Sequence, residues 1–325
     1  MGAVKRVMIT GASGFIGRAA VAQALAEGLE VVAIVRSSVP QSWRNIPRLT
    51  VYRLDLTSSG ATDTLAEMME VDAVVHAAAH LGSDTALQER DTLVPTETLL
   101  HAMLIAGVKH LVLISSLGVY DTARLWPYGT VTEATPLEAV ESARDGYVKG
   151  KLMQEALCQR AADRRGLSLA ILRPGAVYGP GRSWNAHIGV ALGPLLFRVG
   201  FGGELPLCHV TTCARAIVAA ARSEAEGAIN VLDDDRPTRG RFLRRHRRSG
   251  WPRLSVPVPW WLFLLAGTAL SVLPGRRPGL LRPAVLKARM MPLRYSSDLM
   301  HEVLNIPDSP AFEVLMDDAL AGEPQ

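Results

Sequence analysis

Three glycines follow directly on the first apolar run of the chain, residues 4–10, and constrain the fold more than any other feature. Gly11 permits a tight turn, Gly14 lets the backbone approach a pyrophosphate, and Gly17 lets a following helix pack closely on a sheet. The start of that helix offers free N–H groups and a partial positive charge, which bind phosphates. A turn without a ligand is the alternative. We predict a dinucleotide site that includes Gly11, Ser13, Gly14, Phe15, Ile16 and Gly17.

Apolar runs and helical stretches alternate through the first half of the chain. This alternation is typical of βαβ units that build a parallel sheet. Strands are predicted at residues 4–10, 30–35, 49–54, 71–76, 110–115 and 168–173, and helices at 15–27, 91–106 and 146–164. The sequence therefore predicts an α/β protein with a doubly wound parallel sheet, the Rossmann arrangement.

The chain has 325 residues, which is long for one compact core and suits two domains. After Gly181, glycine and proline become more frequent and the periodicity weakens. We predict a dinucleotide-binding domain over residues 1–182 and a smaller, mainly substrate-binding lid over residues 183–325. A helical pattern at 214–221 indicates that the chain returns to the larger domain at about residues 208–232.

Charge and cysteine content narrow the class of protein. Lys+Arg 35 against Asp+Glu 31 leaves +4, too small an excess to indicate nucleic acid as a partner. Three cysteines leave one unpaired in any scheme, so we expect no disulfide framework and a cytoplasmic protein. The N-terminus shows no secretory signal. The most apolar stretch, residues 260–273, is shorter than the ~20 residues that span a bilayer.

The end of the second predicted strand indicates the type of cofactor. Arg36 stands there, and no carboxylate occupies residues 33–38. A carboxylate at this place binds a ribose 2′-hydroxyl, whereas arginine suits a 2′-phosphate, so NADP(H) is favoured over NAD(H). A solvated arginine is the alternative. Asp55 follows the third strand and is expected to accept from the adenine amino group. Three small residues, Ala77, Ala78 and Ala79, leave room where the backbone runs beside the cofactor.

A tyrosine and a lysine four residues apart indicate the chemistry. Tyr147 and Lys151 lie on one face of the helix predicted at 146–164. A nearby ammonium favours phenolate, so we expect a lowered pKa that makes Tyr147 a general acid or base near neutrality. Ser116 follows the fifth strand, at the sheet edge where such folds bind ligands, and is expected to hold the substrate oxygen.

These motifs resemble those of the short-chain dehydrogenase/reductase superfamily, in the extended branch that includes NAD(P)-dependent epimerases and dehydratases. The resemblance implies an NAD(P)-dependent oxidoreductase in which Ser116, Tyr147 and Lys151 carry the chemistry and Pro174 lies near the nicotinamide. It also implies a homodimer through a helix pair. The matching segments run in order over about residues 4–220: TGxxGxxG at 10–17, the adenine-contacting pair Asp55-Leu56, SSxxVY at 115–120, YxxxK at 147–151 and RPxxVYGPG at 173–181.

Departures from the family pattern narrow the range of substrates and reactions that we expect. Thr92 stands where the family usually has an asparagine that links a proton relay, and Ala176 replaces an asparagine that often holds a sugar nucleotide. The 4,6-dehydratases carry Asp-Glu where this chain has Leu117-Gly118, which leaves elimination without an acid/base pair. The usual VDD reads Val-Thr-Thr at 210–212.

The late sequence favours a hydrophobic substrate. Residues 256–263 and the tail at 294–298 are similar to segments of 3β-hydroxysteroid dehydrogenase-like members, and dihydroflavonol reductase-like members are also near. We therefore expect a secondary alcohol and a ketone to be interconverted on a steroid- or isoprenoid-like small molecule. The alternatives are a nucleotide-sugar epimerase with tightly bound NAD(P), and a non-catalytic dinucleotide-binding protein.

Two late segments have interpretations that do not involve hydride transfer. Residues 236–248 contain seven arginines ahead of a Trp-rich apolar run. We favour a solvated, mobile basic loop, with peripheral contact of residues 236–273 with the inner membrane surface as the alternative. Cys208, His209 and Cys213 lack a fourth ligand at zinc spacing, and no metal site is predicted.

Overall fold

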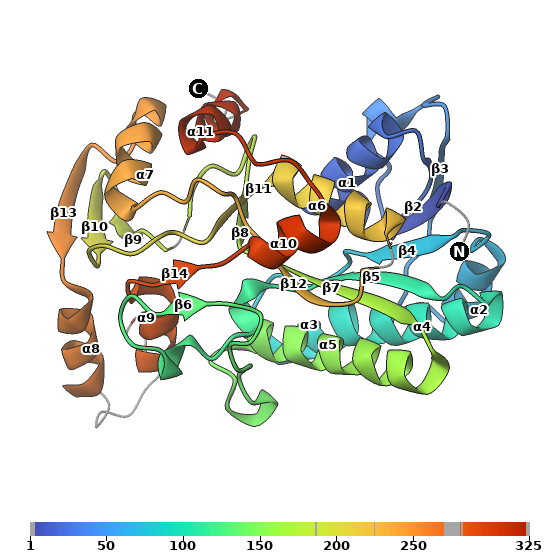
Figure 1. Cartoon of the computed structure of the whole chain (residues 1–325), viewed down its shortest axis with the longest axis horizontal. Coiled ribbons are helices and arrows are strands. Elements are labelled where there is room, and N and C mark those ends of the chain that lie inside the picture. The colour runs from blue at the N-terminus through green and yellow to red at the C-terminus, as the bar shows by residue number, and fades with distance from the viewer. Residues whose placement is uncertain (1–3, 186, 224, 270–279, 281, 323–325) are drawn as a thin grey trace.

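The computed structural model describes residues 4–185, 187–223, 225–269, 280 and 282–322. A seven-stranded parallel sheet forms its centre (Figure 1). Each strand is built from a short apolar run, and β5 is buried along its whole length, as expected for a sheet covered on both faces. The strand order is β12 (Gly227–Val231), β7 (Ser168–Pro174), β5 (His110–Ile114), β4 (Ala73–His76), β1 (Arg6–Thr10), β2 (Glu30–Val35) and β3 (Leu49–Arg53).

Helices cover both faces of this sheet (Figure 1). On one face α1 (Phe15–Ala26) packs against α6 (Val210–Arg222), and on the other lie α2 (Ala61–Glu67), α4 (Val94–Ala106) and α5 (Gly146–Arg165). The order along the sheet reverses between β1 and β4, which opens a crevice at the carboxyl ends of these strands. The predicted Rossmann fold is confirmed.

The helix predicted at 91–106 is interrupted near its start. A short α3 (Thr85–Gln88) leads into a π-helical turn, Glu89–Leu93, and only then into α4. The proline at residue 95 falls in the first turn of α4, where its missing N–H costs no hydrogen bond. The π-turn places Asp91 at a cavity beside the ends of β2 and β3.

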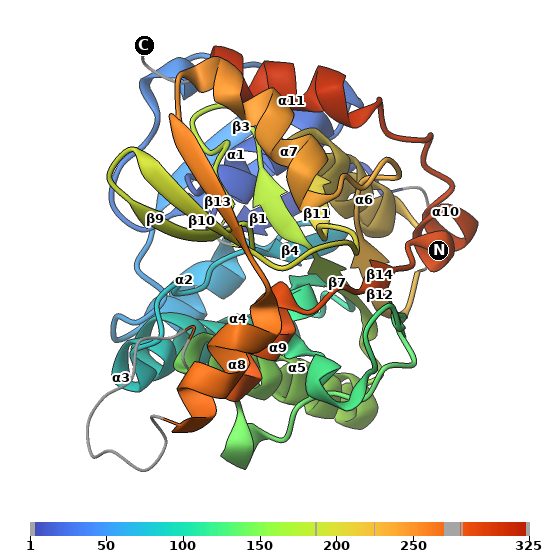
Figure 2. The ribbon, with the colours of Figure 1, turned by 90° about the vertical axis from the view of Figure 1, so that its left-hand side faces the viewer.

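The later chain builds smaller elements beside the carboxyl ends of the strands (Figures 1 and 2). β12 nevertheless belongs to the large sheet, and α6 packs on that sheet beside α1, so the chain returns to the sheet after building some of the smaller elements. The domain limits stay a prediction. The small strands pair as β13 (Leu254–Val258), β10 (Leu195–Val199) and β9 (Gly189–Leu192), as β8 (Ala176–Tyr178) with β11 (Leu207–His209), and as β14 (Arg294–Tyr295) with β6 (Thr130–Val131). The helices are α7 (Arg239–His246), α8 (Trp260–Ala269), α9 (Pro283–Met290), α10 (Asp298–Leu304) and α11 (Phe312–Ala321).

The arginine-rich run forms a helix that ion pairs join to other residues of the chain, so the prediction of a mobile basic loop is wrong. Residues 239–246 form α7, capped by Thr238. Arg241 pairs with Asp235 and Glu313, and Arg245 pairs with Asp317. Carboxylates of α11, later in the chain, thus neutralise several of these arginines. The sequence of residues 236–248 alone could not predict these ion pairs.

The predicted apolar stretch at 260–273 is α8 as far as Ala269, and residues 270–273 lie outside the described residues. Within the part of the chain that the structure describes, no helix has both the length and the apolar character needed to cross a membrane.

Candidate active site

The glycine turn has the geometry that a dinucleotide needs. Gly11 has φ +64°, and a Cβ there would lie 2.7 Å from the Ala78 nitrogen. A Cβ on Gly17 would collide with the Gly11 carbonyl oxygen. Gly14 caps α1, and among the described residues no side chain accepts from the first turn, so the N–H groups of that turn can bind a phosphate. The residues present therefore fit the pyrophosphate of a nicotinamide dinucleotide.

A cavity of about 260 Å³ adjoins this turn and suits the adenosine half. The Asp55 carboxylate accepts hydrogen bonds from the Thr57 N–H at 2.9 Å and the Thr57 hydroxyl at 2.8 Å. These bonds lower the pKa of Asp55, so it stays ionised and able to accept from an adenine amino group. The residues expected here all line the cavity: Gly11, Ser13, Gly14, Arg36, Asp55, Leu56, Ala77, Ala78 and Ala79.

The same cavity contains a carboxylate that the sequence analysis missed. Asp91 lies 3.3 Å from Arg36, whose side chain is 63% exposed. Arg90 binds Asp91 through two hydrogen bonds of 2.9 Å, which lower the pKa of Asp91. No motif points to Asp91, because it reaches the cavity from the π-turn rather than from the end of β2.

A second cavity, of about 450 Å³, joins the glycine turn to Ser116 and Tyr147, two of the three expected catalytic residues, whereas Lys151 does not line it. Ser116 and Tyr147 line it together with Pro174, and Arg182 reaches over the Phe15 ring at 5.1 Å from the ring centroid. Arg182 directly follows the RPxxVYGPG segment, so its position was available as a signal. The expected residues of the turn that line this cavity are Gly11, Gly14, Phe15, Ile16 and Gly17.

Tyr147 and Ser116 come together from different elements. Ser116 caps a short 3-10 helix after β5 and accepts from the Gly118 N–H at 3.0 Å, and Tyr147 lies in the first turn of α5. Both side chains line the same two cavities. Burial raises the pKa of Tyr147 and outweighs the lowering effect of the nearby Ser116 hydroxyl, contrary to the expected lowering by Lys151.

Lys151 is buried, and its ammonium points to the sheet. It donates to the Ile114 carbonyl oxygen at 2.7 Å and to Gln154 Oε1 at 2.9 Å. Burial lowers the pKa of Lys151 to about 8. The lysine is therefore a charged group with two fixed acceptors.

A line of buried side chains connects Lys151 to the glycine turn. Gln154 Nε2 donates to Thr96 Oγ1 at 3.0 Å, His76 Nε2 lies 3.0 Å from the same oxygen, and His76 Nδ1 lies 2.7 Å from Thr10 Oγ1. Burial lowers the pKa of His76 to about 3, so the ring is neutral. Thr92, at the family's asparagine position, binds Gln88 instead and leaves this line to Gln154.

A third cavity, of about 160 Å³, shares Ser116 and Tyr147 and extends under the lid. Thr122 is buried there, and its hydroxyl has no hydrogen-bond partner among the described residues. The Arg289 guanidinium, from α9, likewise has no ion-pair partner within those residues. Arg144, by contrast, is engaged by Glu138 and by carbonyl oxygens of the chain. Most of the exposed lining of this cavity is apolar, with these polar groups among it.

His187 offers this third cavity a hydrogen-bond acceptor. Its backbone N–H donates to Asn185 Oδ1 at 2.8 Å, which identifies that atom as the amide oxygen. His187 Nδ1 lies 2.7 Å from the same oxygen and must carry the proton, so Nε2 is left as an acceptor. Burial lowers the pKa of His187 to about 3, and neighbouring arginines add to the effect.

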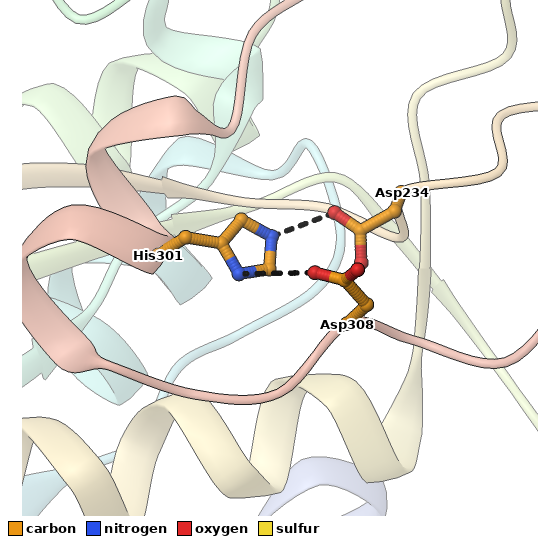
Figure 3. A group of neighbouring side chains, drawn as sticks. All are labelled: Asp234, His301 and Asp308. Atoms are coloured by element: carbon orange, nitrogen blue, oxygen red, sulfur yellow. Dashed lines mark hydrogen bonds and ion pairs between the residues drawn. The ribbon is translucent and has the colours of Figure 1, made fainter.

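A separate cluster of Asp234, His301 and Asp308 has the composition of a metal site (Figure 3). His301 Nε2 lies 2.7 Å from Asp234 Oδ1, and Nδ1 lies 3.1 Å from the Ile306 carbonyl oxygen. Burial disfavours charge on His301, but the bonds to Asp234 and Ile306 outweigh it and raise its pKa. With both ring nitrogens facing acceptors, His301 links α10 to the segment after β12.

Residues 7–231 match the NAD dependent epimerase/dehydratase family. The match covers more than half of the chain, and the protein belongs to this family. It is an NAD(P)-dependent enzyme of the oxidoreductase type.

Curated relatives include reductases. The chain is 29% identical over 251 residues to the dTDP-4-dehydro-6-deoxy-D-allose reductase of Streptomyces bikiniensis, covering 70% of this chain and 76% of the relative. It is 28% identical over 238 residues to the 4-hydroxy-2-methyl-3-oxo-4-farnesyl-3,4-dihydroquinoline-1-oxide ketoreductase of Stigmatella aurantiaca, covering 71% and 69%. The UDP-glucuronic acid 4-epimerase from Bacillus cereus in complex with NAD has the same fold, with TM-score 0.72, 19% identity and 98% of both chains covered.

Proposed function

We propose that this protein interconverts a ketone and a secondary alcohol by hydride transfer with NADP(H). The observation that carries the proposal is the single cavity in which Ser116, Tyr147 and Pro174 meet the glycine turn. The reductases among its relatives support the same reaction type.

The roles of the residues follow from their positions. A bound nicotinamide supplies hydride to the substrate carbon or accepts it. Ser116 and Tyr147, which line the same cavity, hold the carbonyl oxygen, and Tyr147 donates the proton that completes the alcohol. Its raised pKa keeps the phenol protonated at neutral pH, as a donor requires. Lys151 donates to Ile114 and Gln154, so its proposed contact with the ribose on the nicotinamide side requires the ammonium to turn away from these acceptors.

The lining of the third cavity supports a substrate that is polar next to its reacting carbon. Thr122 offers a hydroxyl that has no partner among the described residues, His187 offers an acceptor nitrogen, and Arg289 offers a positive charge. The steroid- or isoprenoid-like skeleton stays a prediction for the rest of the substrate. The Stigmatella relative, whose name combines a farnesyl chain with a polar quinoline oxide, supports such a two-part molecule.

For the cofactor we favour NADP(H), because Arg36 lines the adenosine cavity and is exposed enough to turn toward a 2′-phosphate. Asp91 opposes this preference, but Arg90 already neutralises it. Binding of NADPH against NADH measures the preference directly.

The test is a screen of ketones and sugar nucleotides with NADPH, followed by nicotinamide absorbance. Tyr147→Phe should lower turnover about 100- to 10,000-fold while NADPH affinity is retained. Tyr128→Phe, at an exposed tyrosine outside these cavities, is the matched control. Unaltered turnover in Tyr147→Phe would reject the assignment. A cofactor that co-purifies, never exchanges and shows no net redox change would favour an epimerase, and no turnover on any panel would favour a binding protein.

A further inference from the structure

The outer face of the three-stranded lid sheet is apolar and exposed. Leu195 in β10 pairs with Leu192 in β9 and with Leu254 in β13, so these side chains share one face. Val256 lies two residues after Leu254 and points the same way. Leu192, Leu254 and Val256 are 66%, 61% and 38% exposed. An apolar row of this kind on a small sheet needs a partner.

Helix α8 follows directly after β13 (Figure 2), and it too exposes apolar side chains. One side of α8, with Trp260, Phe263 and Leu264, packs on a buried cluster of α9 and β10. Its other side exposes Trp261, Leu262 and Leu265, of which Leu265 is 61% exposed. A soluble helix normally turns charged residues outward, yet α8 has apolar side chains on both sides.

The chain segment that carries this surface is cationic, although Arg241 and Arg245 near its start are paired with carboxylates from outside the segment. Residues 236–297 contain 14 lysines and arginines and not one aspartate or glutamate. Arg253 and Arg282, which flank β13 and α9, are exposed. Two copies of this chain would bring such cationic stretches together and repel each other, whereas an anionic bilayer would attract them.

We propose that Leu192, Leu254, Val256, Trp261, Leu262 and Leu265, here called the lid-end surface, dock on the surface of an anionic phospholipid bilayer. α8 has ten residues and is about 15 Å long, so it would lie along the interface with Trp261 at the headgroup level. Docking would also place the substrate cavity near lipid, because α8 packs against α9, which carries Arg289 of that cavity.

Vesicle co-sedimentation of the full chain tests this proposal without reference to activity. Vesicles of phosphatidylglycerol and phosphatidylcholine should bind the protein at least about tenfold more tightly than phosphatidylcholine alone, and salt should weaken this binding. Trp261→Glu with Leu265→Glu should reduce binding at least about tenfold. Leu104→Glu, at an exposed leucine of α4, should bind like the wild type.

Circular dichroism and NADPH affinity check that each variant is folded. Leu192→Glu with Leu254→Glu, on the sheet, gives a second variant in case the α8 variant fails to fold. Absence of wild-type binding to anionic vesicles at low salt, or equal binding by folded variants of both kinds, would overturn the proposal. A concentration-dependent dimer that the same variants abolish would assign the lid-end surface to a second copy and overturn it as well.

Discussion

The Lys151 ammonium lies 2.7 Å from the carbonyl oxygen of Ile114, the last residue of β5. This bond ties α5 to the sheet two residues before Ser116. It thereby sets the register between the helix that carries Tyr147 and the strand end that carries Ser116. The lysine is thus a structural tie as well as a source of charge.

Lys151 should make stability depend on pH in the alkaline range. Its folded pKa, about 8, lies below the ordinary value of 10.5, so the unfolded chain binds more protons between these values. Stability should therefore rise with pH from about 8 to 10.5, by about 3 kcal/mol from this group. Urea unfolding of the wild type and of Lys151→Met across this range measures the difference, since the variant lacks the group. A difference that is constant with pH would contradict the assignment.

Arg36 and Asp91 should control the choice of cofactor in opposite directions. Arg36→Ala should weaken NADPH binding about tenfold or more and leave NADH binding nearly unchanged, because only NADPH carries the 2′-phosphate. Asp91→Asn should tighten NADPH binding by removing a carboxylate from the same cavity. Fluorescence titration with both cofactors gives the affinities. Arg44→Ala, at an exposed arginine that does not line this cavity, is the control.

The buried ion pair of Arg173 and Glu155 should contribute strongly to the free energy of unfolding. Arg173 donates to both Glu155 oxygens, at 3.0 and 2.7 Å, and each side chain is only 6% exposed. Glu155→Ala leaves a buried cation unpaired and should lower the free energy of unfolding by about 3–5 kcal/mol.

A double variant distinguishes the loss of the ion pair itself from the cost of leaving one buried charge unpaired. Glu155→Leu with Arg173→Met removes both charges and should recover most of the loss, as measured by urea denaturation. A double variant as unstable as Glu155→Ala would show that hydrogen bonds of these residues to Ser115 and Tyr120 carry the effect instead.

His301 should stabilise the protein most at mildly acidic pH. Its folded pKa is raised, so its contribution is complete below the unfolded value near 6.5 and is lost as pH rises through the folded value. His301→Gln should lower Tm more at pH 6 than at pH 9. Added Zn²⁺ should not raise Tm in either protein, because both ring nitrogens face acceptors. A Tm gain that needs both Zn²⁺ and His301 would make the cluster a metal site.

The sequence alone determined the fold class, the family and the order of the motifs. The glycine turn, the strand ends and the Tyr147–Lys151 spacing each lie within a few residues, and backbone conformation and helical periodicity are properties of short segments.

Only the tertiary structure decided how these groups are charged and which distant residues join them. Burial raises the pKa of Tyr147 and lowers that of Lys151, and burial depends on which segments pack together. Asp91, Thr122 and His187 reach the cavities from elements far apart in the chain. Arginines of α7 pair with carboxylates of α11, about 70 residues later in the chain. Such pairs depend on long-range packing, which the local sequence does not determine.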